Sequence, residues 1–225
     1  TTLRDGIFTN GEQYIATSTF PKGKYQYYFE AQGASTTVYL PADGTLSFQT
    51  GYSNVAFLPG LLGSRLYKQQ VFENKLWEPN WNADVEKLYL TDVGESVDPS
   101  IYTNDIIDEA FGFNVYKKFS ESMDDLVASG MIKEWQAMPY DWRMDLEDIL
   151  GGDVQLRNDV YNIMQSVELL AESSDNGQVT ILGHSNGGLL GKLLISKLAD
   201  AGKGDLVDKF IMVGTPQLGT PSALT

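Results

Sequence analysis

The chain has 225 residues, of which 42% are hydrophobic and 20% charged, so it is long enough for one good-sized core and a smaller module. With 16 Lys and Arg against 30 Asp and Glu, its formal net charge is −14, which disfavours nucleic acids and anionic membranes as partners. The absence of cysteine excludes disulfides and thiol catalysis, and the single histidine, His184, excludes a histidine-rich metal site. Carboxylates alone could still bind calcium, but we predict no metal and no cofactor.

Residues 1–51 are predicted to be rich in β-structure. Aromatic residues recur at every second position from Tyr25 to Phe29, and the strand-like runs 36–40 and 45–49 follow turn signals. The segment resembles the last strands of an extracellular immunoglobulin-like or fibronectin-like sandwich, of which three or four strands are only a part. The alternative is a β-rich extension that packs on the domain after it.

From about residue 52 the pattern changes to alternating strands and helices. This order predicts an α/β fold with a mostly parallel sheet and helices on both of its faces. Asp153 is expected to cap a long helix that continues to Leu170. We therefore divide the chain into a β-rich segment, 1–51, and an α/β domain, 52–225. The predicted strands are 55–58, 135–138, 179–182 and 210–214, and the predicted helices are 116–127, 154–170 and 187–198.

The pentapeptide 183–187 reads Gly-His-Ser-Asn-Gly and matches the pattern G-x-S-x-G. An apolar strand leads into it and an apolar helix leads out, which is the setting of a nucleophile elbow. Ser185 would stand on a sharp turn, and Gly183 and Gly187 would let neighbouring backbone approach without a Cβ clash. The N–H of Asn186 would donate to the developing oxyanion. The alternative is a serine in an ordinary turn between a strand and a helix.

A second glycine-rich loop, 58–64, follows the first strand of the α/β domain. A loop at this early position in the sheet is where a second oxyanion donor is expected. Gly60 would permit the tight turn, and Leu61 would donate its backbone N–H. Taken by itself, the loop is an ordinary glycine-rich connection.

Four segments together resemble the lecithin:cholesterol acyltransferase-like lipases, a family that includes lysosomal phospholipase A2. Their order and approximate spacing agree from residue 55 to residue 225. The most distinctive segment is Pro-Tyr-Asp-Trp-Arg, which begins at Pro139. The four segments are 59–64, 138–143, 183–187 and 213–216.

The resemblance implies an α/β-hydrolase that forms an acyl-enzyme on Ser185 from a lipid ester and passes the acyl group to water or to an alcohol. It also implies transient contact with a lipid surface and places Tyr140, Asp141 and Pro216 near the site. Asp141 and Arg143 could form a charge pair near the site, but a pair that locks a loop is the favoured role. The family's paired cysteines are absent, which indicates a bacterial relative. We expect the protein to be secreted or attached to the cell surface, although the absence of cysteine does not itself identify the compartment.

The acid and the base that Ser185 needs are harder to place. In this fold the chain order is serine, acid, histidine. The carboxylates that follow Ser185, namely Asp200, Asp205 and Asp208, are not clearly at the end of a later strand. His184 directly precedes the serine, and the turn should direct the two side chains apart. We therefore expect the acid and the base to lie beyond Thr225, and the 225 residues alone to be inactive.

The leading hypothesis is thus a serine lipase or phospholipid acyl hydrolase on an α/β-hydrolase domain truncated at its C-terminus. The near alternative is an acyltransferase with an alcohol acceptor, because no residue here separates water from an alcohol. A non-catalytic binding or adhesion module on a hydrolase scaffold is the alternative from another class. A peptidase on the same fold is less favoured, because the matching segments are lipase-like.

Overall fold

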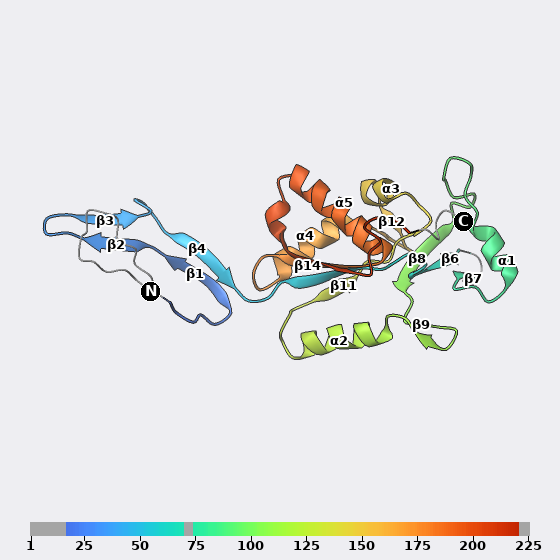
Figure 1. Cartoon of the computed structure of the whole chain (residues 1–225), viewed down its shortest axis with the longest axis horizontal. Helices are drawn as coiled ribbons and strands as arrows, with labels where there is room; N and C mark the ends of the chain where they lie inside the picture. The colour runs from blue at the N-terminus through green and yellow to red at the C-terminus, as the bar shows by residue number, and fades with distance from the viewer. Residues whose placement is uncertain (1–16, 70–73, 221–225) are drawn as a thin grey trace. The chain divides into compact units, whose positions relative to one another are not determined.

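The structure is a computed structural model that describes residues 17–69 and 74–220. The chain divides into two compact units, Thr1–Gly51 and Tyr52–Thr225. In Figure 1 the strands of the first unit are drawn in blue, and the colours of the second unit run from cyan to red. Each unit is described by itself below.

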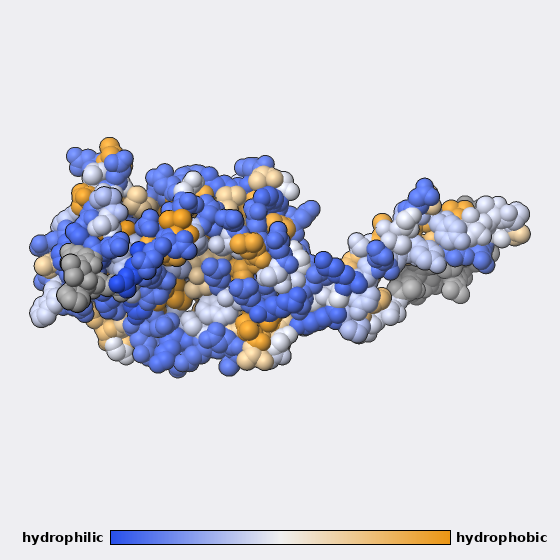
Figure 2. Space-filling view, turned by 180° about the vertical axis from the view of Figure 1, so that it is seen from behind, coloured by the Kyte–Doolittle hydropathy of each residue, from blue (hydrophilic) through white to orange (hydrophobic). Residues whose placement is uncertain are grey.

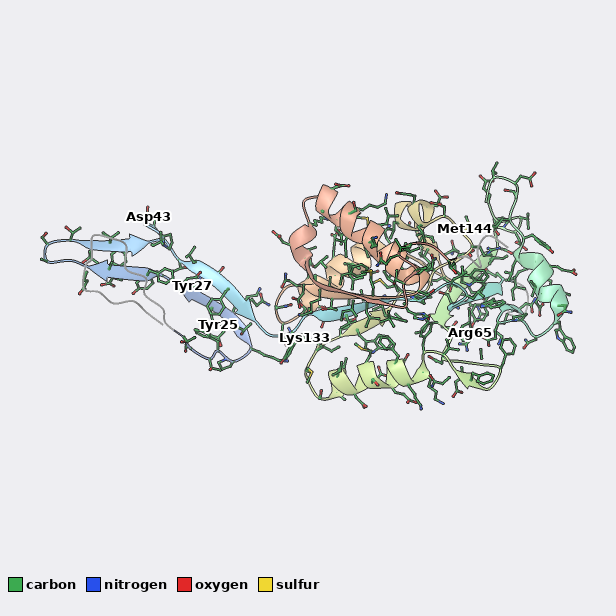
Figure 3. All side chains as sticks on the ribbon, in the orientation of Figure 1. Tyr25, Tyr27, Asp43, Arg65, Lys133 and Met144 are labelled. Carbon is green, nitrogen blue, oxygen red and sulfur yellow. The ribbon has the colours of Figure 1, made fainter. Side chains whose placement is uncertain are left out.

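The first unit consists of two antiparallel strand pairs. Strand β1 pairs with β4, and β2 pairs with β3. We expected one continuous aromatic strand, but the chain changes its pairing partner at Tyr28 and forms two. Tyr25 and Tyr27 project from β1 (Figure 3), and the Tyr25 ring stacks on Phe48 with ring centroids 5.3 Å apart. The bounds are β1 Gly23–Tyr27, β2 Phe29–Gln32, β3 Thr37–Leu40 and β4 Leu46–Thr50.

The second unit is built on a four-stranded sheet in the order β11-β5-β14-β15, and all of its strands run parallel. The parallel sheet predicted from the alternating pattern is therefore present. β5 and β14 occupy the centre, and every residue of β5 is buried. The bounds are β5 Asn54–Leu58, β11 Trp135–Ala137, β14 Val179–His184 and β15 Val207–Val213.

Helices cover both faces of this sheet because alternate residues of β5 point to opposite sides. Ala56 and Leu58 share a core with helices α3, α4 and α5. Val55 and Phe57 pack toward α2 instead. Figure 1 accordingly shows α2 across the sheet from α4 and α5. The bounds are α2 Lys117–Ala128, α3 Leu146–Gly151, α4 Ile163–Ser173 and α5 Asn186–Asp200.

The predicted long helix from Asp153 is wrong in its first half. Two short strands, β12 (Val154–Gln155) and β13 (Val160–Tyr161), pair antiparallel there, and α4 begins only at Ile163. The Asn162 side chain accepts a hydrogen bond from the N–H of Gln165, so Asn162 is the helix cap. Val154 and Tyr161 pack on the same core as the helix, which is why the apolar spacing continues through the hairpin.

A small antiparallel sheet, in the order β7-β6-β8, lies between the first and second strands of the parallel sheet along the chain. No strand was predicted here; β6 reads Ser-Arg-Leu-Tyr-Lys, which lacks the strict alternation of apolar and polar residues that is typical of a half-buried strand, and its pairing is irregular in register. Arg65 of β6 (labelled in Figure 3) binds Asp105 at 2.6 Å and Glu78 at 3.1 Å. The bounds are β6 Ser64–Lys68, β7 Asn74–Trp77, α1 Asn82–Val85, a 3-10 turn at Glu86–Leu88, β8 Ile101–Ile106, β9 Glu109–Ala110 and β10 Phe113–Asn114.

The surface of the second unit is mainly hydrophilic, with separate hydrophobic patches on the face shown in Figure 2. β15 forms one edge of the parallel sheet, and its residues Ile211, Met212 and Val213 are all exposed. None of the helices in 17–69 and 74–220 has the length and apolar character needed to cross a membrane.

Candidate active site

Ser185 stands at the sharp turn between β14 and α5. Its backbone adopts φ +51° and ψ −121°, a conformation that non-glycine residues rarely adopt. The N–H of Ser185 donates to the Val213 carbonyl oxygen at 2.8 Å, which ties the turn to the neighbouring strand β15. Such a strained turn from a strand into a helix is the geometry that presents a nucleophilic serine at the edge of a sheet.

The glycines on either side of Ser185 are required by close backbone contacts. A Cβ on Gly187 would lie 2.1 Å from the Leu58 carbonyl oxygen, and a Cβ on Gly183 would lie 2.6 Å from the Gly187 carbonyl oxygen. Backbone atoms cannot move aside as the end of a side chain can. The turn therefore needs glycine at both positions, for the steric reason given in the sequence analysis.

The loop that follows β5 packs directly against this turn. A Cβ on Gly60 would lie 2.9 Å from the Ser185 Cβ and 2.9 Å from His184 Nδ1. The N–H of Gly63 donates to the Gly60 carbonyl oxygen at 2.9 Å and closes the loop. No residue in the described part of the chain accepts a hydrogen bond from the N–H of Leu61. The structure thus brings Gly60 and its neighbour Leu61 beside the predicted nucleophile.

Tyr116 links the loop to the turn. Its hydroxyl accepts the Gly60 N–H at 2.9 Å and lies 2.8 Å from His184 Nδ1. Burial lowers the pKa of His184 and raises the pKa of Tyr116, so both groups are uncharged at neutral pH. The Nδ1 atom of His184 is therefore hydrogen-bonded to the Tyr116 hydroxyl. Sequence reasoning missed Tyr116, because it lies outside every motif and reaches the site only through the tertiary fold.

Tyr140 lies beneath the same loop and is fully buried. Its hydroxyl donates to the Pro59 carbonyl oxygen at 2.8 Å, and its N–H donates to the Ser64 hydroxyl at 3.1 Å. Burial raises the pKa of Tyr140 far above its usual range, while the nearby Asn186 side chain acts in the opposite direction. Tyr140 therefore contacts the backbone of the loop and is closed off from solvent.

Asp141 is not joined to Ser185 by any contact within the described residues. It binds Arg143, whose Nε lies 2.9 Å from Asp141 Oδ1. The same guanidinium donates to the Leu88 carbonyl oxygen at 3.1 Å and to the Ser96 hydroxyl at 3.2 Å. The pair therefore connects two segments that are distant in the chain, in agreement with the structural role that we favoured from the sequence.

Pro216 belongs to the turn after β15, which approaches the start of α5. A Cβ on Gly188 would lie 1.9 Å from the Thr215 hydroxyl oxygen, so Thr215 packs on the first turn of α5. The Pro216 carbonyl oxygen accepts the N–H of Gly219 at 3.0 Å. Pro216 thus lies in a segment that borders the helix of the elbow, and no direct contact with Ser185 is found among the described residues.

An apolar groove of about 530 Å³ opens beside Leu61. The loop contributes one wall, and it is fixed there by two indole groups: Trp77 Nε1 donates to the Leu62 carbonyl oxygen at 2.8 Å, and Trp142 Nε1 donates to the Ser64 carbonyl oxygen at 3.0 Å. Within 17–69 and 74–220, no cluster of three histidine or carboxylate side chains is arranged to hold a metal ion. The groove is lined by Leu61, Leu62, Trp77, Val85, Leu88, Tyr89, Leu90, Trp142 and Arg143.

A comparison with known families identifies the chain. The profile described as lecithin:cholesterol acyltransferase matches residues 102–225, which is more than half of the sequence. The chain belongs to the lecithin:cholesterol acyltransferase family, so the resemblance seen in the sequence is confirmed. Membership implies acyl transfer of the lipase or acyltransferase type on lipid substrates and suggests an α/β-hydrolase fold. No curated protein sequence matches the chain.

Proposed function

We propose that the second unit is an α/β-hydrolase domain that cleaves lipid esters through an acyl-enzyme on Ser185. The observation that carries the proposal is the strained backbone of Ser185 at the head of α5, packed against the loop that holds Gly60. This packing supports the proposal, because acyl transfer requires a serine hydroxyl beside backbone donors from two different segments.

In the proposed reaction, the Ser185 hydroxyl oxygen attacks the carbonyl carbon of the ester and loses its proton to a general base. The N–H groups of Leu61 and Asn186 stabilise the oxyanion, and the N-terminus of the 15-residue helix α5 favours the same negative charge. The alcohol part leaves with the proton. Water or a second alcohol then attacks the acyl-enzyme and releases Ser185.

The general base is not His184 in this proposal. The Nδ1 atom of His184 is bound to the Tyr116 hydroxyl, and the 225 residues contain no second histidine. We propose that the acid and the base come from outside these residues. The 225-residue chain alone should therefore hydrolyse a chromogenic short-chain ester at no more than about the background rate. Turnover at the rate of a complete lipase would contradict this part of the proposal.

The substrate is proposed to be an uncharged or zwitterionic lipid ester. The groove beside Leu61 is lined mainly by apolar side chains, which suits an acyl chain. The net charge of −14 disfavours anionic lipid surfaces. We propose that the protein is bacterial and is secreted or attached to the cell surface; the absence of the family's cysteine pairs supports only the bacterial origin.

An acyltransferase that uses an alcohol as acceptor is the second candidate, and membership in the family favours it. The two are separated by incubating phosphatidylcholine vesicles with the natural polypeptide that contains these residues, with and without a sterol or a long-chain alcohol. Free fatty acid as the product in both cases indicates a hydrolase, whereas an ester of the added alcohol indicates a transferase.

The control in both assays is the Ser185→Ala variant, which should release no acyl group above background. A variant that keeps its activity would contradict the proposed nucleophile. A folded wild-type protein that is inactive on all of these lipids would favour the non-catalytic binding module.

A further inference from the structure

One peptide group of the loop beside Ser185 is held at both of its polar ends. The carbonyl oxygen of Pro59 and the N–H of Gly60 belong to the same peptide bond. Tyr140 donates its hydroxyl to that carbonyl oxygen at 2.8 Å. Tyr116 accepts that N–H with its own hydroxyl oxygen at 2.9 Å. The two hydroxyl groups therefore fix the plane of this peptide from opposite sides.

Each tyrosine also contacts a residue next to Ser185 in the chain. The Tyr116 hydroxyl lies 2.8 Å from Nδ1 of His184, the residue before the serine. Since Tyr116 already accepts the Gly60 N–H, its own proton is free to be donated to an unprotonated Nδ1, which fits the lowered pKa of His184. The Asn186 side chain, on the other side of Ser185, lies close enough to the Tyr140 hydroxyl to lower its pKa.

Resting on the proposed function, we propose that Tyr116 and Tyr140 are positioning residues that clamp the Pro59–Gly60 peptide and so hold the Leu61 N–H at the oxyanion position beside Ser185. The Leu61 N–H belongs to the next peptide, Gly60–Leu61, whose carbonyl oxygen accepts the Gly63 N–H at 2.9 Å. With the Pro59–Gly60 peptide clamped before it and this hydrogen bond made after it, the direction of the Leu61 N–H is fixed. The role of His184 is then to orient the Tyr116 hydroxyl.

The two tyrosines restrict a loop whose glycines would otherwise make its backbone flexible. Glycine at positions 60 and 63 is required by close contacts, since a Cβ on Gly63 would lie 2.8 Å from the Tyr116 hydroxyl oxygen. Glycine also leaves the backbone of a loop free to adopt many conformations. A backbone donor contributes to catalysis only when it is already in place as the oxyanion forms. Two buried hydroxyl groups supply the rigidity that the glycines remove.

The first test is amide hydrogen exchange, measured by NMR on the natural polypeptide that contains these residues. Tyr140→Phe removes a donor to the Pro59 carbonyl oxygen, and neither of the two N–H groups that are followed, those of Gly60 and Gly63, is hydrogen-bonded to Tyr140. The proposal nevertheless expects the Gly60 and Gly63 N–H groups to exchange about tenfold faster in this variant, because the peptide loses one of its two anchors. Tyr116→Phe should accelerate the same two groups.

A matched control is available in Tyr161→Phe. The Tyr161 hydroxyl also donates to a proline carbonyl oxygen, that of Pro139, and burial raises the pKa of Tyr161 strongly. Tyr161→Phe therefore loses the same kind of hydrogen bond, but one whose acceptor is Pro139 and not the Pro59–Gly60 peptide. Tyr161→Phe should leave the exchange of Gly60 and Gly63 unchanged.

The second test is steady-state kinetics with a short-chain ester. Tyr116→Phe and Tyr140→Phe should each lower kcat about tenfold while KM stays within about twofold, because the loop acts on the transition state. The double variant should be little worse than the poorer single variant, since both hydroxyl groups act through one peptide. Tyr161→Phe should keep kcat within about twofold of the wild type.

The outcomes separate this proposal from the proposed function. If Ser185→Ala is inactive but both clamp variants behave like Tyr161→Phe in exchange and in kcat, the clamp is refuted and the nucleophile stands. Faster exchange with an unchanged kcat also refutes the positioning role. If Ser185→Ala stays active, the proposed function fails, and with it the catalytic role of the clamp, while the exchange data still report on the rigidity of the loop.

Discussion

The amino and carboxyl ends of the central strands β5 and β14 differ in whether their polar groups have hydrogen-bond partners within the protein. At the amino end, the Asn54 side chain is fully buried: its Nδ2 donates to the Leu170 carbonyl oxygen at 3.0 Å, and its Oδ1 accepts the Glu134 N–H at 2.9 Å. At the carboxyl end, Ser185 has a strained backbone, and the Leu61 N–H donates to no described residue.

The contrast shows how one sheet separates stability from chemistry. Buried polar groups at the amino end have their partners within the protein, so they add stability and fix the positions of neighbouring segments. The carboxyl end holds a strained residue in place by crowding several backbone segments around it. The predictions below test whether the two ends differ in this way.

The largest effect is expected for Gly187→Ala at the carboxyl end. The new Cβ would lie 2.1 Å from one backbone carbonyl oxygen and 2.5 Å from a second one, neither of which can move without displacing β5 or the loop. We expect a loss of about 4 kcal/mol or more in the free energy of unfolding, measured by urea denaturation. Gly151→Ala is the control, because its Cβ would meet nothing within 4 Å, and the change should stay within about 1 kcal/mol. Equal stability of the two variants would contradict this account.

A smaller effect is expected for Asn54→Ala at the amino end. The substitution removes hydrogen bonds to the Leu170 carbonyl oxygen and the Ser173 hydroxyl, and it leaves the N–H groups of Lys133 and Glu134 without their acceptor. We expect a loss of about 2–4 kcal/mol in urea denaturation.

The variant should nevertheless keep the reactivity of Ser185 wherever it remains folded, because Asn54 lies at the other end of β5. Asn114→Ala, at an exposed position, is the control and should change stability by no more than about 0.5 kcal/mol. A loss of Ser185 reactivity without a loss of stability would contradict the claim that the two ends have separate roles.

The smallest effect is expected for Asp208→Asn. The hydrogen bond from Lys209 is the main cause that lowers the pKa of Asp208, and a hydrogen bond from the Ser53 hydroxyl, at 2.9 Å, adds to it. A carboxyl group with a lowered pKa in the folded state stabilises the protein above its ordinary pKa of about 3.9, and this contribution disappears as the pH falls through the lowered value.

Because Lys209 is largely exposed, we expect Asp208→Asn to cost only about 0.5–1 kcal/mol at pH 7. The difference from the wild type should shrink as the pH is lowered below about 4. Urea denaturation at a series of pH values measures it. A difference that stays constant from pH 7 to pH 3 would show that the charge of Asp208 is not the cause.

The parallel sheet and the elbow were predictable because their signals are local. The strands at 55–58 and 179–182 are short apolar runs, and the structure extends them by only one or two residues. The glycines around Ser185 were predicted from steric need, and the structure supplies the contacts that require them. The local pattern alone thus predicted where the candidate nucleophile lies.

The residues that hold the site together were not predictable, because their signals are tertiary. Tyr116 is separated from Gly60 by 56 positions and from His184 by 68, and no motif connects them. The start of α4 was misplaced for a related reason, since Val154 packs on the same core as the helix and extends its apolar spacing. Spacing along the chain identifies which residues are apolar, but only the fold shows which segments they bring together.

The central claim is that Ser185 is a nucleophile, and covalent labelling tests it most directly. The natural polypeptide that contains these residues would be treated with a fluorophosphonate, and the modified serine located by peptide mass spectrometry. The account predicts one adduct, on Ser185, which is lost in Ser185→Ala while the melting temperature is unchanged. An adduct on another serine, or no adduct on protein that melts as a folded domain, would contradict it.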